Sequence, residues 1–330
     1  MERNYKIAHE GGKECCVRIG GWEQVIEPYT TFVRTIAIVD EAVARNFDLF
    51  EHFSEVLTIG GGEGSKSLET AAGLWQTLIE MGVDRQAVLV GIGGGTITDL
   101  VGFVASTYMR GVKLILLPTT LLGQVDAAIG GKCGINLGGY KNMVGTFNLP
   151  SNVVCDPLWL STLPEKEWRA GMAEVIKTAI LGDAELFELL ENTTLDEVRS
   201  DAELCGQIVA RTVAVKCRVV NDDFRESGVR RVLNLGHTLA HAIESLTREF
   251  SHGEAVAVGL AYVSKMAVEQ GALSEEDCGR IVAILERYGL PTITNLPEDE
   301  LHEAMLHDKK NSNQQIKWVV PTGIGTMPTF

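Results

Sequence analysis

The chain has few cysteines, and they follow no metal-binding or disulfide pattern. Its seven cysteines are scattered over 330 residues, and no two of them form a C-x-x-C motif. An odd, dispersed set of this kind argues against a disulfide framework and against a cysteine zinc site. We therefore expect reduced thiols, most of them buried.

Long apolar runs and positive charge are also scarce. No segment is apolar and long enough to cross a bilayer, and residues 1–6 hold no stretch of signal-peptide type. Only 29 Lys and Arg oppose 44 Asp and Glu, which gives a net charge of −15. Such a chain repels polyphosphates at long range. We expect a cytoplasmic protein that binds neither nucleic acid nor membrane, and that binds any phosphate through a local basic cluster.

The first half of the chain has the pattern of an α/β domain. Its continuous apolar, β-branched runs are typical of parallel strands buried on both faces, with helical periodicity between them. The strands are expected at residues 35–39, 56–59, 87–92 and 113–117, and the helices at residues 67–81 and 96–106. These residues predict a Rossmann-like, parallel-sheet domain over residues 1–160.

Beyond residue 163 the pattern changes to long amphipathic stretches. They predict helices at residues 165–181, 184–191, 202–220, 231–247, 253–270 and 274–288. One late strand is expected at residues 316–320, before Pro321. With no repeat or low-complexity linker in the chain, we predict a mainly α-helical second domain over residues 161–330.

Two glycine clusters directly follow predicted strands. Gly93, Gly94 and Gly95 open the helix after the third strand, and residues 60–64 read Gly-Gly-Gly-Glu-Gly. Glycine lets the backbone approach a pyrophosphate, and the free N–H groups of a helix start bind it. The pattern is not G-x-G-x-x-G, but it favours a dinucleotide site over a merely tight turn. Asp40 ends an earlier strand, where a carboxylate binds ribose hydroxyls or caps a helix.

Three of the seven histidines fall between residues 237 and 252. His237 and His241 are four residues apart, so on a helix they share one face and can converge on a metal. Without the internal Glu of H-E-x-x-H, such a pair alone is more often structural. His252 and one carboxylate could complete the donor set. The best carboxylate is Glu174, on an apolar stripe where an unpaired charge is costly, although a salt bridge to Lys177 explains it equally well.

Basic and amide side chains recur in polar, glycine-rich loops. Each alone is most often a solvated surface charge, yet several adjoin glycine pairs that let a ligand approach, as in Gly130-Gly131-Lys132. The set comprises Arg110, Lys132, Lys141, Asn142, Lys216, Arg230, Lys309 and Lys310. Together these residues indicate an anion site to which both predicted domains contribute.

Taken in order, these segments closely resemble the 3-dehydroquinate synthases of the sugar-phosphate cyclase family, which use NAD and zinc, or cobalt in its place. The resemblance covers about residues 39 to 325. It is carried by Gly93-Gly94-Gly95 with Asp99, Thr107-Tyr108-Met109-Arg110-Gly111, Pro118-Thr119-Thr120-Leu121-Leu122, Gly130-Gly131-Lys132, Lys141-Asn142, Gly171-Met172-Ala173-Glu174-Val175-Ile176-Lys177, Asn234-Leu235-Gly236-His237-Thr238 with His241, His252-Gly253-Glu254 and Asp308-Lys309-Lys310.

The resemblance implies a role for each of these residues. Glu174, His237 and His252 would bind the metal. NAD would be held by Asp40, Glu63, Lys66, Gly94, Gly95, Asp99, Thr119, Thr120 and Lys141. The substrate would be held by Asp126, Lys132, Asn142, Lys177, Lys216, Arg230, Asn234 and one or both of Lys309 and Lys310, while Glu226 and His241 would handle protons. Arg110 would reach the phosphate site of a neighbouring subunit, which implies a homodimer.

The implied substrate is 3-deoxy-D-arabino-heptulosonate 7-phosphate, and the implied products are 3-dehydroquinate and phosphate, in the shikimate pathway. Oxidation at C5, loss of phosphate, reduction and aldol closure would follow one another, so NAD would be regenerated within each turnover. Thr98, Ala42 and Cys133 stand where many members have glycine, asparagine and threonine. These departures concern the geometry of cofactor binding and not the reaction.

Three other functions agree with part of the sequence. A polyol dehydrogenase of related architecture would also join a dinucleotide domain to a helical metal domain, but it needs no phosphate cluster. A non-catalytic NAD-binding sensor could lose the metal ligands, yet all three candidates are present. Cyclases that make inosose or valiolone skeletons are the nearest alternative, although Asp99 and Gly130-Gly131-Lys132 resemble the dehydroquinate branch more.

Overall fold

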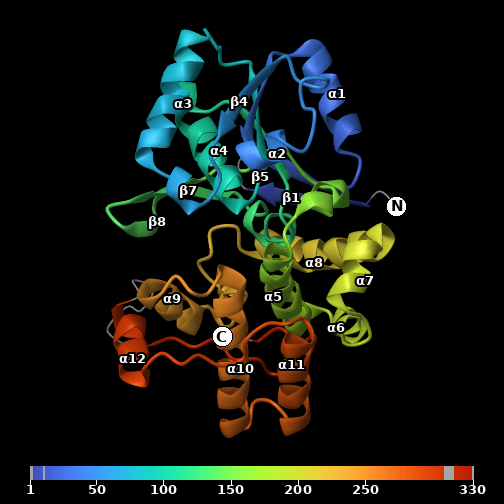
Figure 1. Cartoon of the computed structure of the whole chain (residues 1–330), viewed down its shortest axis with the longest axis vertical. Helices are drawn as coiled ribbons and strands as arrows, with labels where there is room; N and C mark the ends of the chain where they lie inside the picture. Colours follow the sequence, from blue (N-terminus) through green and yellow to red (C-terminus); the bar gives the residue numbers. More distant parts are fainter. Residues whose placement is uncertain (1–2, 10–11, 308–315, 329–330) are drawn as a thin grey trace. The chain divides into compact units, whose positions relative to one another are not determined.

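A computed structural model describes residues 3–9, 12–307 and 316–328 of the chain. Its contacts divide the chain into two compact units (Figure 1): unit 1 is residues 1–163 with 216–221, and unit 2 is residues 164–215 with 222–330. The domain boundary between residues 160 and 161 stays a prediction, because compactness does not show that either part folds alone. Of the described helices, none combines the length and the apolar character that a membrane span requires.

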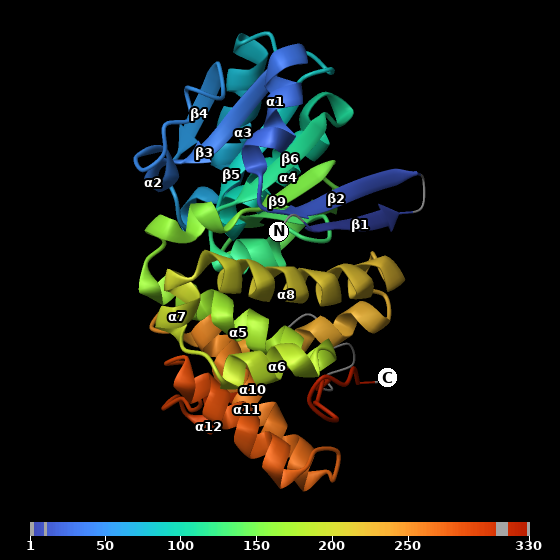
Figure 2. The same ribbon diagram turned by 90° about the vertical axis from the view of Figure 1, so that its right-hand side faces the viewer.

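Unit 1 is built on a seven-stranded sheet in the order β1-β2-β9-β6-β5-β3-β4. The strands are β1 Arg3–His9, β2 Lys13–Ile19, β3 Thr35–Asp40, β4 Glu55–Ile59, β5 Val88–Gly93, β6 Lys113–Pro118 and β9 Asn152–Cys155. Neighbours are parallel, except β1 and β2, which form a long antiparallel pair in Figure 2. The four predicted strands are confirmed as β3, β4, β5 and β6, whereas β1, β2 and β9 were not predicted.

Helices and a hairpin cover this sheet. The segments are α1 Trp22–Phe32, α2 Glu41–Ala44, η1 Glu63–Ser65, α3 Leu68–Glu80, α4 Gly95–Thr107, η2 Tyr108–Arg110, η3 Gly123–Ala127, η4 Pro157–Thr162 and the antiparallel strands β7 Lys132–Leu137 and β8 Tyr140–Phe147. Figure 1 shows α1 on one side of the sheet and α3 with α4 on the other. The predicted helices at residues 67–81 and 96–106 are confirmed as α3 and α4.

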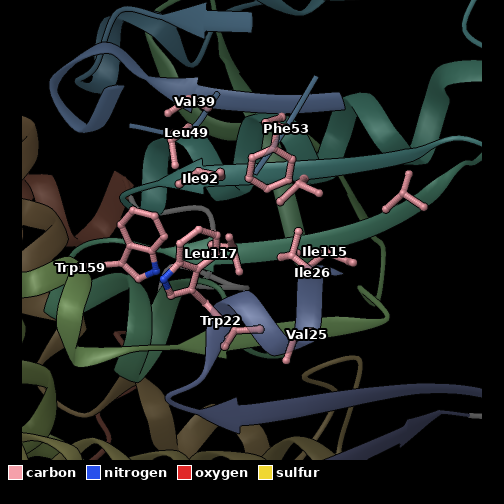
Figure 3. Close-up of a cluster of buried hydrophobic side chains, with 14 residues drawn as sticks. Trp22, Val25, Ile26, Val39, Leu49, Phe53, Ile92, Ile115, Leu117 and Trp159 are labelled. Carbon is pink, nitrogen blue, oxygen red and sulfur yellow. The ribbon is translucent and has the colours of Figure 1, made fainter. Parts of the chain in front are cut away.

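The core of unit 1 lies between α1 and the sheet (Figure 3). Alternate residues of β3, Ala37 and Val39, pack into this core because successive side chains of a strand point to opposite faces. The rings of Trp22 and Trp159 lie with their centroids 4.9 Å apart at its edge. Burial on both faces therefore explains the continuous apolar runs of the central strands.

The order in which strands are added to the sheet reverses between the neighbours β3 and β5. The next strand after β3, β4, lies beyond β3, and the next strand after β5, β6, lies beyond β5 on the other side. Ligands of open α/β sheets bind outside the carboxyl ends of the strands at such a point. Asp40 ends β3 and Gly93 ends β5, so the topology places both ends at the predicted dinucleotide edge.

Unit 2 is made of helices. They are α5 Glu165–Gly182, α6 Ala184–Glu191, α7 Leu195–Ser200, α8 Ala202–Asp222, η5 Val229–Asn234, α9 His237–Leu246, α10 His252–Glu269, α11 Glu275–Arg287 and α12 Glu298–His307, with residues 216–221 of α8 counted in unit 1. Five of the predicted helices are confirmed as α5, α6, α8, α10 and α11. In Figure 1, α10 and α11 lie side by side, in agreement with their contacts.

Two predictions for this half were wrong. The helix expected at residues 231–247 begins only at His237, because a 3₁₀ segment precedes it and Gly236 has a φ of 77°. The strand expected at residues 316–320 has no strand partner among the described residues. Instead, Thr238 donates a hydrogen bond to the Lys317 carbonyl at 3.2 Å, and the ring of Trp318 packs against Tyr262. The apolar run therefore packs on helices and not on a sheet edge.

Candidate functional site

Three helices of unit 2 bring Glu174, His237 and His252 together. Each offers one ligand atom, and these atoms all lie within 4.8 Å of one another; no other His, Cys, Asp and Glu side chains of the described segments form such a group. The Nε2 atoms of His252 and His237 lie 3.3 and 3.5 Å from Glu174 Oε1. One carboxylate and two imidazoles are a donor set that zinc accepts.

Close approach of the helices creates this arrangement. A Cβ atom on Gly259 of α10 would lie 2.0 Å from the carbonyl oxygen of Gly236, directly before α9. A Cβ atom on Gly253 would lie 2.3 Å from the backbone of Ala170 in α5. These two glycines therefore allow α10 to contact both neighbouring segments backbone to backbone, next to the three side chains.

Hydrogen bonds set the orientation of both imidazole rings. His237 Nδ1 lies 3.1 Å from the Leu235 carbonyl, which can only accept, so this nitrogen carries the proton. His252 Nδ1 lies 3.3 Å from Glu244 Oε2. Both rings thus direct Nε2 toward Glu174, as metal-binding histidines do. Sequence analysis missed Glu244, although it lies three residues after His241 on the same helix.

Lys177 forms an ion pair with Glu174 Oε2, and both side chains are 1% exposed. The sequence left ion pairing and metal binding as alternatives for Glu174. In the structure the two carboxylate oxygens have different partners, because Oε2 contacts Lys177 and Oε1 faces the imidazoles. The two roles are therefore compatible.

The charged groups of this cluster shift one another's pKa values. Burial opposes ionisation of Glu174, but Lys177 and the His252 hydrogen bond outweigh it and lower its pKa to about 2. Burial, with the charges of Lys177 and His252, lowers the pKa of His237 well below its usual range. Burial also opposes the charge of His252, yet its bonds to Glu174 and Glu244 raise its pKa to about 10.

Four further site residues predicted for unit 2 lie on α9 and in the segment before it. The ring of His241 meets the ring of His237 edge to face, with centroids 5.6 Å apart. Asn234 donates a hydrogen bond to Glu226 Oε1 at 2.8 Å, and Glu226 has a φ of 58°. Arg230 is buried and donates to the Phe224 carbonyl. A non-glycine residue held at positive φ stores backbone strain, which is frequent at functional sites.

The glycine cluster of unit 1 forms the start of α4. Gly94 is the N-cap and makes no side-chain cap. A Cβ atom on Gly94 would lie 3.0 Å from Thr120, and one on Gly95 would lie 3.0 Å from Ala127. The N–H of Thr119 bonds the Gly93 carbonyl. The helix start is thus bare backbone, as an anion site requires.

Beside this helix start, Lys66 is the centre of a polar cluster. Its ammonium pairs with Asp99 and also bonds Asn142 Oδ1. Burial raises the pKa of Asp99 against the opposing charge of Lys66. Asn136, which was not predicted, donates to Glu63 Oε1 at 2.7 Å and accepts from the N–H of Asn142 at 3.0 Å. The structure thus joins Asn142, assigned to substrate, to residues assigned to NAD.

Asp40 caps α2 through the N–H of Ala42 at 2.8 Å, while a Cβ atom on Gly61 would lie 2.6 Å from its Oδ2. Ala42 is one of the three departures from the family pattern, and the other two, Thr98 and Cys133, also have partners within unit 1. Thr98 donates to the Gly95 carbonyl at 3.0 Å within α4. The Cys133 thiol lies 3.2 Å from Thr146 Oγ1. All three residues therefore have local structural partners.

The remaining predicted residues of unit 1 are basic or acidic. Lys216 donates to both the carbonyl and the carboxylate of Asp126. Lys132 and Lys141 are exposed at the β7 and β8 hairpin, and Arg110 is exposed with a φ of 67°. Of the residues predicted for unit 2, Lys309 and Lys310 lie outside the described residues.

Comparisons with known proteins agree with this geometry. Residues 56–170 match the family described as 3-dehydroquinate synthase N-terminal, and residues 171–311 match that described as 3-dehydroquinate synthase C-terminal. A 3-dehydroquinate synthase of Sulfurovum sp. (strain NBC37-1) is 42% identical over 308 residues, which are 90% of this chain and 87% of that protein.

Solved structures of cyclases have the same fold. The 2-epi-5-epi-valiolone synthase of Streptomyces hygroscopicus subsp. jinggangensis 5008, with NAD⁺ and Zn²⁺ bound, matches at TM-score 0.88 and 27% identity over 99% of this chain and 95% of its own. A 2-deoxy-scyllo-inosose synthase complexed with carbaglucose-6-phosphate, NAD⁺ and Co²⁺ matches at 0.86 and 25% over 99% and 94%. The predicted α/β class with a helical second half is confirmed. On its sequence, the chain belongs to the 3-dehydroquinate synthase family of enzymes.

Proposed function

We propose that this chain converts 3-deoxy-D-arabino-heptulosonate 7-phosphate into 3-dehydroquinate and phosphate, with NAD and zinc as cofactors. Membership of the family supports the reaction. The single observation of the structure that carries the proposal is the buried carboxylate of Glu174 facing the Nε2 atoms of His237 and His252. A structural ion pair alone would need only Lys177.

The donor set fits a catalytic metal ion. We propose Glu174, His237 and His252 as its ligands, since three protein ligands leave one position for substrate. When bound, the ion supplies Lewis-acid polarisation of a substrate oxygen. Imidazole and carboxylate donors also suit cobalt, which is bound to the 2-deoxy-scyllo-inosose synthase.

The carboxyl edge of the sheet fits NAD. The bare backbone at the start of α4 would bind its pyrophosphate, and Asp40 at the end of β3 would bind ribose hydroxyls. NAD supplies a reversible hydride acceptor, which suits a reaction without net oxidation. The residues we propose for it are Asp40, Glu63, Lys66, Gly94, Gly95, Asp99, Thr119, Thr120 and Lys141.

The chain's own side chains would hold the substrate and move its protons. His241 shares a helix face with His237, so we propose that its imidazole accepts a substrate hydroxyl proton. Glu226, fixed by Asn234, would be a second proton acceptor. The phosphate, carboxylate and hydroxyls of the substrate would be bound by Arg110, Asp126, Lys132, Asn142, Lys177, Lys216, Arg230, Asn234 and one or both of Lys309 and Lys310, as the family resemblance assigns them. These local charges would oppose the field of a chain with net charge −15.

Phosphate release tests this function. We expect the zinc-loaded, NAD-bound protein to release phosphate from 3-deoxy-D-arabino-heptulosonate 7-phosphate without net NADH. Turnover of only the precursors of inosose or valiolone would reassign the chain to another cyclase branch. Net NADH from a polyol would instead identify a dehydrogenase.

Lys132→Ala should keep zinc and NAD binding but lose turnover. An exposed lysine beside Gly131 suits an anionic substrate, and losing a charge-assisted hydrogen bond costs about 1.5–3 kcal/mol, which is roughly 10- to 150-fold in rate. Calorimetric titration of zinc and NAD, together with the phosphate assay, separates these effects. A fall in NAD affinity alone would place Lys132 at the cofactor.

We also propose a homodimer in which Arg110 serves the neighbouring subunit. Its exposed guanidinium and positive φ suit a side chain that projects from its own fold. Arg110→Ala and His237→Ala homodimers should each be inactive. In a heterodimer, one site would have an intact metal centre and an intact arginine, so activity should return at up to about half of the sites. Inactive, verified heterodimers would mean that Arg110 serves its own subunit.

We place the protein in the cytoplasm. All seven cysteines are free, and five of them are buried. Free thiols persist in a reducing compartment. Cell fractionation, with the chain detected in the cytosolic fraction of cells that express it, would test this location.

A further inference from the structure

Glu244 is a carboxylate that none of the proposed roles uses. It lies on α9 seven residues after His237, so the two side chains are two helical turns apart on the same face. The Glu244 side chain is 15% exposed, and its Oε2 is 3.3 Å from His252 Nδ1. Glu244 thus links α9 to the first residue of α10.

The geometry separates the two nitrogens of His252. Nδ1 faces Glu244 and Nε2 faces Glu174, each at 3.3 Å from a carboxylate oxygen. A carboxylate that accepts a hydrogen bond from one ring N–H fixes the tautomer and the ring plane, and it increases the basicity of the other nitrogen. Glu244 therefore has the position of a group that prepares Nε2 to bind a cation.

His237 provides an internal comparison. Its Nδ1 lies 3.1 Å from the Leu235 carbonyl, which is a neutral acceptor. His252 has a charged acceptor instead. Since a charge-assisted hydrogen bond is stronger than a neutral one, the orientation of His252 depends more on its acceptor than that of His237 does.

We propose that Glu244 is a positioning residue for the metal centre, which holds the His252 ring with Nε2 toward the metal. This inference rests on the proposed metal function of Glu174, His237 and His252. Glu244 would not touch substrate, cofactor or metal. Its effect would be on metal affinity and ligand geometry, and only through these on turnover.

The test compares Glu244→Ala and Glu244→Gln with the unaltered full chain. Each protein is freed of metal, and zinc affinity is measured by competition with a chromophoric chelator at one pH. The visible absorption of the Co²⁺-loaded proteins then reports ligand geometry. Glu191→Ala is the matched control. Glu191 accepts two hydrogen bonds from Arg280, at 2.8 and 2.7 Å, and so pairs with α11 instead of with a ligand side chain.

Glu244→Ala should lower zinc affinity by about 10- to 100-fold and alter the cobalt spectrum. Glu244→Gln should lose less, because its amide oxygen still accepts a bond from Nδ1 and so rescues part of the affinity. Glu191→Ala should bind zinc like the unaltered chain.

Unchanged zinc affinity and cobalt spectrum in Glu244→Ala would overturn the inference. An equal loss in Glu191→Ala would also overturn it, since general destabilisation would then explain the effect. If Glu244→Ala does not fold, Glu244→Gln decides: an affinity and spectrum like those of the unaltered chain would contradict the proposed role. A failure of the unaltered chain to bind zinc would overturn the proposed function itself, which is a distinct result.

Discussion

Each of the two units contains an ion pair between a buried lysine and a carboxylate. Lys66 pairs with Asp99 in unit 1, with the side chains 4% and 21% exposed. Lys177 pairs with Glu174 in unit 2, with both side chains 1% exposed. The attraction within a buried ion pair offsets the cost of desolvation only when further hydrogen bonds satisfy the remaining polar atoms of the pair. The groups that complete each pair therefore distinguish their functions.

The two pairs differ in which member is shared. In unit 1 the ammonium of Lys66 is shared, because it contacts both Asp99 and the amide oxygen of Asn142. In unit 2 the carboxylate of Glu174 is shared, because its second oxygen faces the two imidazoles. A shared ammonium organises polar groups around a cation that the chain already has. A carboxylate that faces two imidazoles forms a donor set, because neutral imidazoles and a carboxylate together can bind a metal ion.

Removing one imidazole should have the largest effect on this comparison. His252→Ala leaves two of three protein ligands, so we expect loss of bound zinc. Turnover should fall by about 10³-fold or more, because the Lewis-acid contribution is several kcal/mol. Metal analysis and the phosphate assay measure the two effects. The control is His302→Ala, because His302 is an exposed histidine of α12. Full zinc occupancy in His252→Ala would show that His252 is not a ligand.

Removing each lysine sharpens the contrast between the pairs. Without metal, Lys177→Met and Lys66→Met should each lose about 3 kcal/mol of unfolding free energy, because a buried carboxylate loses its partner. Zinc should stabilise both variants, because both keep Glu174, His237 and His252. The gain should be larger in Lys177→Met, since there the dication also replaces the ammonium beside Glu174.

Urea unfolding with and without zinc measures this difference. An equal gain of stability from zinc in both variants would show that the ion does not compensate for the ammonium lost beside Glu174. No restoration in either variant would separate Glu174 from the metal.

Backbone contact between helices offers a smaller perturbation of the metal cluster. In Gly253→Ala, the added Cβ would lie 2.3 Å from Ala170, so α10 must shift away from α5. We expect a loss of about 1–3 kcal/mol of stability and weaker zinc binding. Gly279→Ala is the matched control, because nothing lies within 4 Å of its added Cβ in α11. It should stabilise by up to about 1 kcal/mol, and unchanged zinc affinity in Gly253→Ala would contradict our account of the helix approach.

Strands were predictable from the sequence where both faces are buried. All six residues of β5 are buried, and its apolar run was recognised. β2 begins with two exposed residues and then alternates buried and half-buried ones, and most of β8 is exposed, so neither has such a run. α1 contains Pro28, which disguised its helical periodicity. The missed elements named here are therefore those that lack a continuous apolar run or an uninterrupted helical period.

The candidate site was predictable where spacing carries the signal. Spacing grouped the three histidines and offered Glu174 as a donor, but it left a salt bridge to Lys177 as an equal explanation. The family resemblance then selected Glu174, His237 and His252, whose ligand atoms lie within 4.8 Å of one another. Glu244 and Asn136 were missed because their roles depend on side chains from other elements. The packing role of Gly253 against Ala170 was not predicted, because a sequence does not show which backbone segment a glycine contacts.

The smallest effect is expected at Asn136, which supports the unit 1 cluster without belonging to its ion pair. Asn136→Ala removes the bonds to Glu63 and to the N–H of Asn142, whose φ of 56° is costly to hold. Losing about 1 kcal/mol of orientation should weaken NAD binding roughly fivefold and leave zinc affinity unchanged. Asn192→Ala, which removes a bond to the Glu188 carbonyl in unit 2, should change neither affinity. Fluorescence titration of NAD and chelator competition for zinc measure both affinities. If Asn136→Ala weakened zinc and left NAD binding intact, the assignment of Glu63 and its neighbours to the cofactor would have to be abandoned.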